Sequence, residues 1–251
     1  MVNVLINGAK GRMGKKVFEA ISANENVKAV CGVDLVEDLS NKDFPIYSNF
    51  SKVTEQIDVV IDFSAPASLP AILKYLTENS INGVLCATGY TEDDMNAIKK
   101  ASEKVAIFRS ANMSLGVNVV IDLIKKATQT LEGFDIEIIE KHHNNKVDAP
   151  SGTALMLADA VKEVKPEKFY VYGREGVVGK RNKNEIGIHA VRGGNIVGEH
   201  EVIFAYGNET ITLSHQAFDR SVFAEGAVNA AKYLKGKDCG IYNMSDLISG
   251  R

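Results

Sequence analysis

The sequence has few cysteines, almost no excess of charge of either sign and no long apolar run. Its 251 residues include only Cys31, Cys86 and Cys239, and none of them has the C-x-x-C or other short spacing of a metal site or disulfide framework. We therefore expect no metal and a reducing, cytoplasmic compartment. The net charge of −3 disfavours binding to nucleic acid or to an anionic membrane.

Targeting and membrane segments are also missing from the pattern. No stretch approaches the roughly 18 apolar residues that a membrane-spanning helix needs. The strand-like run 2–7 follows the first residue directly, with no basic and apolar leader before it, so we expect no signal peptide. The 45% of hydrophobic residues and 24% of charged residues are instead ordinary for a globular protein with a core.

The first half of the chain alternates short apolar runs with amphipathic segments. The glycine-rich stretch 8–14 follows the first run, and helical spacing covers 15–24 and 67–79, with Pro70 in a first turn. Thr91, followed by three acidic residues, is expected to cap another helix. Strands are predicted at 2–7, 27–34, 58–64, 83–89 and 105–112. This alternation is typical of a parallel, doubly wound α/β sheet.

The pattern changes near residue 113. A longer amphipathic helix is predicted over 117–131, a helix near 152–164 and a last helix over 221–237. Strands with alternating or glycine-bounded patterns are predicted at 134–143, 169–173, 185–193, 195–207 and 209–218. They suit a mixed or antiparallel sheet. We predict two domains, 1–112 and 113–220, and the pattern allows 221–251 to join either.

Gly8, Gly11 and Gly14 form G-x-x-G-x-x-G, a variant of the dinucleotide-binding fingerprint. The turn follows the first strand and precedes the first helix, where a pyrophosphate would meet the helix N-terminus. Asp34 ends the second strand, 20 residues after Gly14, in the position of a carboxylate that accepts from ribose hydroxyls. These features favour a Rossmann-like dinucleotide-binding domain over a glycine turn that binds nothing.

Asp34 also bears on the choice of cofactor, because a carboxylate there repels the 2′-phosphate of NADP and favours NAD. Leu35 follows it, so no arginine offsets that charge. We interpret Lys15 and Lys16 as part of a solvated helix face, whereas Arg12 fits either that interpretation or a cofactor contact. The basic residues near the turn are Lys10, Arg12, Lys15 and Lys16.

The stretch EKHHNNKVDAPSGTA (140–154) is the richest in chemically active residues. His142 and His143 end a strand and point to opposite faces, so they should not share one role. A metal site is disfavoured because the pair lacks a partner at ligand spacing. General acid–base catalysis suits histidine, which titrates near neutral pH. Lys146 suits binding of an anionic group or donation of a proton.

The end of the same stretch predicts an anion site. Ser151 is placed to cap a helix, and the amides of Gly152 and Thr153 would be exposed at its N-terminus, where a carboxylate is favoured. The alternative for the whole stretch is an ordinary strand–loop–helix connection with a capped start and surface histidines.

On these residues the chain resembles the bacterial dihydrodipicolinate reductases, also called 4-hydroxy-tetrahydrodipicolinate reductases, of the diaminopimelate and lysine pathway. The resemblance spans essentially the whole length, and HHxxKxDAPSGTA is its most specific part. The matching segments are GAKGRMG (8–14), DFS (62–64), ATGY (87–90), SANMSLGVN (110–118), EKHHNNKVDAPSGTA (140–154) and IGIHAVRGGNIVGEHEV (186–202).

The resemblance implies a fold, an activity and an assembly. The fold is a dinucleotide domain, to which 221–251 returns, and a mixed α/β domain for substrate binding, whose open sheet packs in a homotetramer. The activity is NADH- or NADPH-dependent reduction of a cyclic, unsaturated dicarboxylate to tetrahydrodipicolinate, with loss of water.

The resemblance also implies roles for individual residues. His142 takes the place of the proton donor and Lys146 that of a lysine that binds substrate and supports proton transfer. His143, Gly152 and Thr153 take dicarboxylate-binding positions, next to Ser151. The implied cofactor contacts are Gly8, Ala9, Lys10, Gly11, Arg12, Met13, Asp34, Cys86, Ala87, Thr88, Ser110, Ala111, Asn112 and Met113.

Two departures from the family pattern concern the cofactor. Cys86-Ala87-Thr88 stands where many relatives have Gly-Thr-Thr, and Leu35 stands where some carry an arginine. Two other functions stay open on the residues alone. One is another two-domain dehydrogenase, acting on aspartate or aspartate semialdehyde, which would give no reason for HHxxKxDAPSGTA. The other is a regulator that senses NAD(H) and needs neither proton donor nor anion site.

Overall fold

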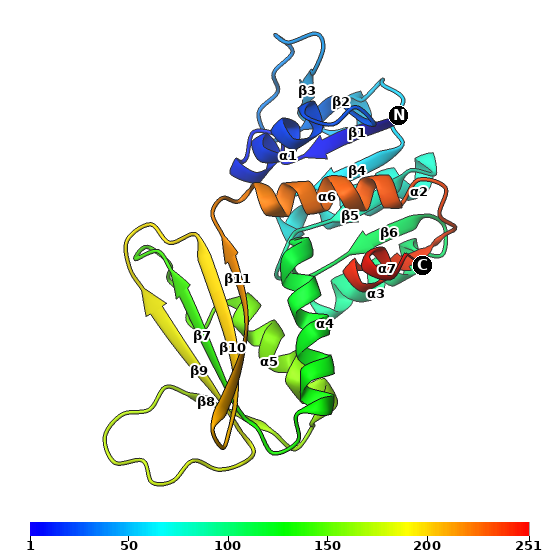
Figure 1. The fold of residues 1–251 in the computed structure, drawn as a ribbon. Helices are drawn as coiled ribbons and strands as arrows, with labels where there is room; N and C mark the ends of the chain where they lie inside the picture. Colours follow the sequence, from blue (N-terminus) through cyan, green and yellow to red (C-terminus); the bar gives the residue numbers. More distant parts are fainter. Residues whose placement is uncertain (251) are drawn as a thin grey trace. The chain divides into compact units, whose positions relative to one another are not determined.

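The computed structural model describes residues 1–250, which divide into two compact units. The first unit holds Met1–Leu115 together with the segment from Arg220 to the end of the described chain. The second unit is Gly116–Asp219. Figure 1 labels the α-helices and most of the strands of both. Every helix in residues 1–250 is too short or too polar to cross a bilayer.

The first unit is built on a parallel sheet with the strand order β12-β6-β5-β4-β1-β2-β3. The chain runs outward from β1 to β3 on one side and from β4 to β6 on the other, so the strand order reverses between β1 and β4. The carboxyl ends of strands at such a point are where doubly wound sheets bind ligands. The strands are β1 (Val2–Asn7), β2 (Val27–Val33), β3 (Ile46–Tyr47), β4 (Val59–Asp62), β5 (Asn82–Leu85), β6 (Ala106–Arg109) and β12 (Gly240–Tyr242).

Helices cover both faces of this sheet because its strands are apolar on both sides. Val4 packs in one core with residues of α1 (Arg12–Ser22) and α6 (Ser221–Tyr233). Leu5, its neighbour in β1, packs in a second core with α2 (Leu69–Asn79) and α3 (Glu92–Ala101). Two short 3₁₀ turns, η1 (Phe50–Lys52) and η2 (Pro66–Ser68), and helix α7 (Met244–Ser249) complete the unit.

The second unit has a mixed sheet with the order β11-β10-β7-β9-β8. β7 is parallel to β9 and antiparallel to β10. One face forms a core with α4 (Leu115–Thr130) and α5 (Gly152–Val164), where Ile138 and Phe204 are fully buried. The opposite face carries charged side chains. The strands are β7 (Asp135–His142), β8 (Phe169–Tyr172), β9 (Glu185–Arg192), β10 (Gly198–Tyr206) and β11 (Glu209–Ala217).

The predicted fold class, a doubly wound parallel sheet with a second mixed sheet, is confirmed. The cap at Thr91 and the position of Pro70 in the first turn of α2 are confirmed as well. The predicted strands over 83–89 and 105–112 are too long, because the chain leaves the sheet after Leu85 and after Arg109. The last helix ends at Tyr233, and the sequence pattern missed β12, which is three residues long and pairs with β6.

The cap of α3 gives a stability test. The Thr91 hydroxyl accepts from the Asp94 amide at 3.2 Å, and the Asp94 carboxylate accepts from the Thr91 amide at 2.9 Å. Thr91→Ala should lower the free energy of unfolding in urea by about 1 kcal/mol. The control is Thr77→Ala inside α2, where the hydroxyl donates to carbonyls of its own helix, those of Leu73 and Lys74. That variant should keep or raise stability because alanine favours a helix interior. Equal effects of the two changes would contradict the role of the cap.

Candidate active site

The glycine turn of the first unit leaves the start of α1 open. The amides of Gly8 and Ala9 both donate to the Val33 carbonyl at the end of β2, at 2.9 and 3.3 Å. Gly11 precedes α1 in an extended conformation, and no described side chain caps the first amides of that helix. A Cβ on Gly14 would lie 2.2 Å from the Gly8 carbonyl oxygen, so only glycine allows this close packing. Open amides behind a tight turn fit a bound pyrophosphate.

Asp34 lies beside this turn, where the sequence placed it. Its carboxylate accepts from the amides of Lys10 and Leu35, each at 2.8 Å, which fixes its orientation and leaves further lone pairs for hydroxyl donors. The Lys10 ammonium lies 3.7 Å from the Asp38 carboxylate. Leu35 is 95% exposed and adds no charge. The residues present therefore fit the ribose of a dinucleotide.

A cavity of about 310 Å³ within the first unit brings three predicted segments together. Ala87, between the lining residues Cys86 and Thr88, is buried, and the Ser110 hydroxyl donates to the Asn112 carbonyl at 2.8 Å. The sequence analysis did not assign three further lining residues, Phe63, Arg220 and Phe223. Phe63 lies in the matching segment DFS, and the other two belong to no quoted motif. The predicted residues that line the cavity are Met13, Cys86, Thr88, Ala111, Asn112 and Met113.

A buried carboxylate joins the carboxyl ends of β1 and β4, where the strand order reverses. Asp62 is fully buried and accepts from the Asn7 side-chain amide at 2.8 Å and from the Ser64 amide at 3.0 Å. Burial raises the pKa of this carboxyl above its usual value, although these donors oppose the shift. The sequence showed DFS as a matching segment but not this structural role.

His142, at the end of β7, is held by a second buried carboxylate. Its ring Nδ1 lies 2.6 Å from Glu140 Oε2, and the Glu140 side chain has no exposed surface. Arg192 donates to both Glu140 oxygens, at 2.6 and 2.7 Å, and the Ser151 amide donates at 3.0 Å. Burial would raise the pKa of Glu140, but the hydrogen bonds outweigh it and hold that pKa below its usual value.

Ser151 links the start of α5 to this cluster. Its hydroxyl accepts from the Ala154 amide at 3.1 Å, as the predicted helix cap, and lies 2.8 Å from Nε2 of His200. The His200 ring stands edge-on to that of His142, with the centroids 5.2 Å apart. Because the Ser151 hydroxyl is buried and already bound, it supports the site from behind and does not face an open surface.

The other predicted residues of this stretch are more open. Gly152 is exposed at the first turn of α5, and Thr153 is half-buried. Lys146 lies in the loop after β7 and pairs with both oxygens of Asp148 at 2.8 Å. His143 is half-buried just beyond the strand. The structure thus places His142 and the start of α5 around one carboxylate, with Lys146 in the loop that joins them.

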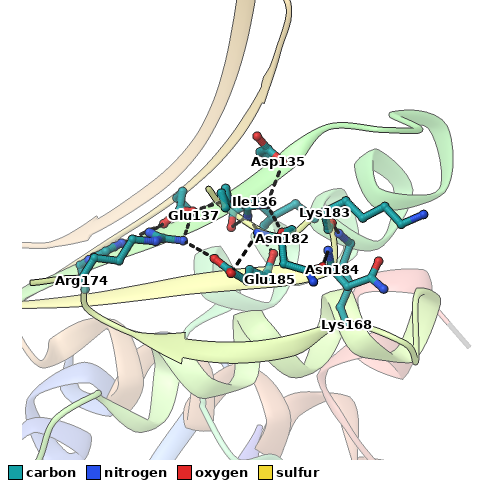
Figure 2. A network of polar contacts seen from close by, with 11 residues as sticks. Asp135, Ile136, Glu137, Lys168, Arg174, Asn182, Lys183, Asn184 and Glu185 are labelled. Carbon is teal, nitrogen blue, oxygen red and sulfur yellow. Dashed lines mark hydrogen bonds and ion pairs between the residues drawn. The ribbon is translucent and has the colours of Figure 1, made fainter. Parts of the chain in front are cut away.

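A comparable cluster lies on the opposite face of the same sheet. Glu137 accepts from both terminal nitrogens of Arg174 at 2.9 Å and from Arg181 Nε at 2.9 Å, and lies 2.8 Å from His189 Nε2. Figure 2 shows the arginine contacts that fasten the segment after β8 to β7 and β9. No group of three metal-ligating side chains occurs within residues 1–250.

Comparisons with known proteins agree along the whole chain. The family models described as the N-terminus and C-terminus of dihydrodipicolinate reductase match residues 2–113 and 116–248. The sequence is 52% identical over 249 residues to the 4-hydroxy-tetrahydrodipicolinate reductase of Caldanaerobacter subterraneus subsp. tengcongensis, covering 99% of this chain and 98% of the relative. It is 48% identical over 251 residues to that of Clostridium tetani, with coverage of 99% and 98%.

The fold is similar to that of a solved relative. Dipicolinate-bound dihydrodipicolinate reductase from Paenisporosarcina sp. TG-14 superposes with a TM-score of 0.83 over 97% of each chain, at 24% identity.

His200 gives a test of the buried cluster. Burial lowers its pKa from 6.5 to about 4. Between pH 6.5 and pH 4, His200 is therefore protonated in the unfolded chain and neutral in the folded chain. The free energy of unfolding should therefore fall as the pH drops from 6.5 towards 4, by ~3 kcal/mol. In His200→Gln, which can still bind Ser151, this part of the pH dependence should vanish. An unchanged difference between the stabilities at pH 7 and pH 4.5 would contradict a buried, neutral His200.

Proposed function

The chain belongs to the dihydrodipicolinate reductase family, and from this premise we propose how its own residues reduce 4-hydroxy-tetrahydrodipicolinate to tetrahydrodipicolinate in lysine biosynthesis. The observation that carries the proposal is the anchoring of the His142 ring on buried Glu140, directly beside the open first turn of α5. One carboxylate thus orients an acid–base group and the start of an anion-binding helix together.

The first unit holds the cofactor in this proposal. NADH or NADPH, when bound, supplies the hydride. The open amides at the start of α1 bind the pyrophosphate, and the Asp34 carboxylate accepts from the ribose hydroxyls. The cavity segments that contain Met13, Thr88 and Asn112 receive the nicotinamide half. Asp34 and the uncharged Leu35 favour NADH.

The second unit binds the dicarboxylate. The exposed Gly152 amide and Thr153 meet one carboxylate at the N-terminus of α5, where the helix dipole favours negative charge. Lys146 exchanges its contact with Asp148 for a substrate carboxylate, and His143 adds a polar contact. Ser151, predicted beside the dicarboxylate-binding positions, holds this turn through its buried hydroxyl.

The reaction consumes one hydride and one proton and releases one water. His142 supplies the proton from Nε2, since Nδ1 is engaged by Glu140. Negative charge that develops on the reduced ring is stabilised by Lys146 and by the amides of the α5 turn. This division of work accounts for the dense polar stretch between β7 and α5.

Two further proposals concern assembly and compartment. The charged face of the mixed sheet is covered by no helix of its own unit within the described residues and carries exposed Val191 beside Lys141, which supports the homotetramer that the family resemblance implies. Cys31, Cys86 and Cys239 are free thiols, which supports a cytoplasmic location.

The test of the function follows loss of the reduced-nicotinamide absorbance, with substrate generated in situ from pyruvate and aspartate semialdehyde by the preceding synthase. Oxidation should require both the synthase and this protein. His142→Gln should lose about 10²–10⁴-fold in turnover while NADH binding persists. Lys146→Ala should lower turnover and raise KM.

The matched control is His189→Gln, which replaces a histidine on the opposite face of the sheet and should keep its turnover. Near-normal turnover of His142→Gln would remove it as the proton donor. No oxidation by folded wild-type protein that binds NADH would overturn the proposed reaction.

Asp34 gives a separate test of cofactor preference. Wild-type protein should bind NADH more tightly than NADPH, because the carboxylate accepts from the 2′-hydroxyl and repels a 2′-phosphate. Asp34→Ala should weaken the binding of NADH more than the binding of NADPH, as measured by titration of nicotinamide fluorescence. Equal losses for the two cofactors would remove Asp34 from the ribose contact.

A further inference from the structure

We propose that Glu140 is a positioning residue for His142: its buried carboxylate keeps a proton on Nδ1 and makes Nε2 the atom that exchanges a proton with the substrate. The proposal rests on the proposed function, since that function makes His142 the proton donor. Glu140 itself touches neither substrate nor cofactor in this account, so its effect on the reaction passes through the histidine ring.

The carboxylate of Glu140 is held without freedom to turn. Its side chain has no exposed surface, and both oxygens accept from the planar guanidinium of Arg192, which comes from the neighbouring strand β9. Oε1 also accepts from the Ser151 amide, and Oε2 meets Nδ1 of His142. The donors therefore arrive from β9, from the start of α5 and from the end of β7, and together they fix where the carboxylate points.

The opposite side of the His142 ring carries its second nitrogen, Nε2. Within residues 1–250 no hydrogen-bond partner meets Nε2, and the side chain keeps 12% of its surface exposed. Gly198, at the start of β10, lies against this nitrogen, since a Cβ there would be 3.1 Å from Nε2. A glycine at this place leaves room for the ring in the orientation that Glu140 sets.

The protonation pattern follows from what each group can donate. An ionised carboxylate only accepts hydrogen bonds, so Nδ1 must carry a proton in both charge states of the ring. When the ring is cationic, its second proton is on Nε2. In the reaction the Nε2–H bond breaks, the proton passes to the reduced substrate, and the ring becomes neutral with Nδ1–H intact. Glu140 stays ionised throughout.

The charged groups around His142 act in opposite directions. Burial lowers its pKa most strongly, Glu140 on β7 raises it, and Lys146 in the loop and Arg192 on β9 lower it. His200 on β10, the remaining titratable neighbour, has a pKa of about 4 and so is neutral in the range of the assay. Glu140 is thus the negative charge that allows His142 to be cationic when it must give a proton.

The decisive experiment is the pH dependence of turnover between pH 4.5 and 9, a range that extends below the wild-type limb. In wild-type protein, turnover should fall at high pH as His142 loses its donor proton. Glu140→Gln removes the charge and keeps the shape of the side chain. The alkaline limb of its pH–turnover profile should move to lower pH by about 1–3 units, because the loss of the Glu140 charge lowers the pKa of His142. Turnover at pH 8 should fall by about 10–10³-fold relative to wild type. This deficit should shrink as the pH falls below the wild-type limb, which lies below the usual pKa of histidine because burial lowers the pKa of His142.

A second variant predicts the opposite shift. Arg192→Gln removes a cation that lowers the pKa of His142 and leaves Glu140 less neutralised, so the alkaline limb should move to higher pH. Arg192→Gln tests the proposal on its own if Glu140→Gln, which leaves Arg192 without its carboxylate, fails to fold. The matched control is Glu137→Gln, which loses the same charge from a cluster of arginines and a histidine on the opposite face (Figure 2) and should leave the limb in place.

Urea unfolding of the whole chain, followed by circular dichroism, reports folding of each variant, and affinity for NADH reports whether its first unit is intact. If Glu140→Gln lowers turnover equally at every pH, or if its limb and that of Arg192→Gln stay at the wild-type position, Glu140 only supports the structure and the inference is wrong. Failure of the proposed function gives different results. Wild-type protein would then not oxidise NADH, or His142→Gln would turn over normally whatever Glu140 does.

Discussion

The second unit depends on the cost of burying the Glu140 carboxylate. Removing an ionised carboxylate from water costs several kcal/mol unless charged and polar donors replace the water. Arg192 and the Ser151 amide supply those donors, and each belongs to a different element of the fold. The end of β9 and the start of α5 are therefore held in register with the end of β7. His142 Nδ1 and Arg192 Nη1 both contact Oε2 of Glu140. The interactions that stabilise the buried carboxylate therefore also orient the His142 ring.

The first unit uses a carboxylate in a similar place for a different purpose. Asp62 is buried at the carboxyl end of β4 and binds Asn7 at the end of β1, where the strand order reverses. Its donors are neutral amides and hydroxyls, so burial dominates and its pKa lies above the usual value. Glu140 has an arginine, so its pKa lies below the usual value. In both units, polar residues at the strand ends fix the position of the backbone where the functional loops begin.

Much of this arrangement could be predicted from the sequence where the signal is local. The spacing of Gly8, Gly11 and Gly14, the strand alternation before His142 and the capping residues Thr91 and Ser151 each depend on neighbours within one or two turns. The predicted strand lengths failed where apolar residues continue past the sheet, as after Leu85. There the apolar side chains line a loop and cavity rather than a strand.

The contacts that complete the sites were outside the reach of local patterns. Arg192 binds Glu140 across 52 residues of sequence, and nothing near either residue marks the pairing. One cavity is lined by residues that precede the second unit in the sequence and by residues that follow it, namely Phe63, Arg220 and Phe223. The strand β12 is too short to show a period, and its pairing with β6 depends on the fold of the whole first unit.

The protonation state of the His142 ring tests the central constraint most directly. Long-range nitrogen–proton NMR of the ¹⁵N-histidine-labelled wild-type protein at pH 8 distinguishes the two neutral tautomers of each ring. The account predicts that His142 carries its proton on Nδ1, with Nε2 unprotonated, because Glu140 accepts from Nδ1. A proton on Nε2, or an even mixture of the two forms, would mean that Glu140 does not fix the ring.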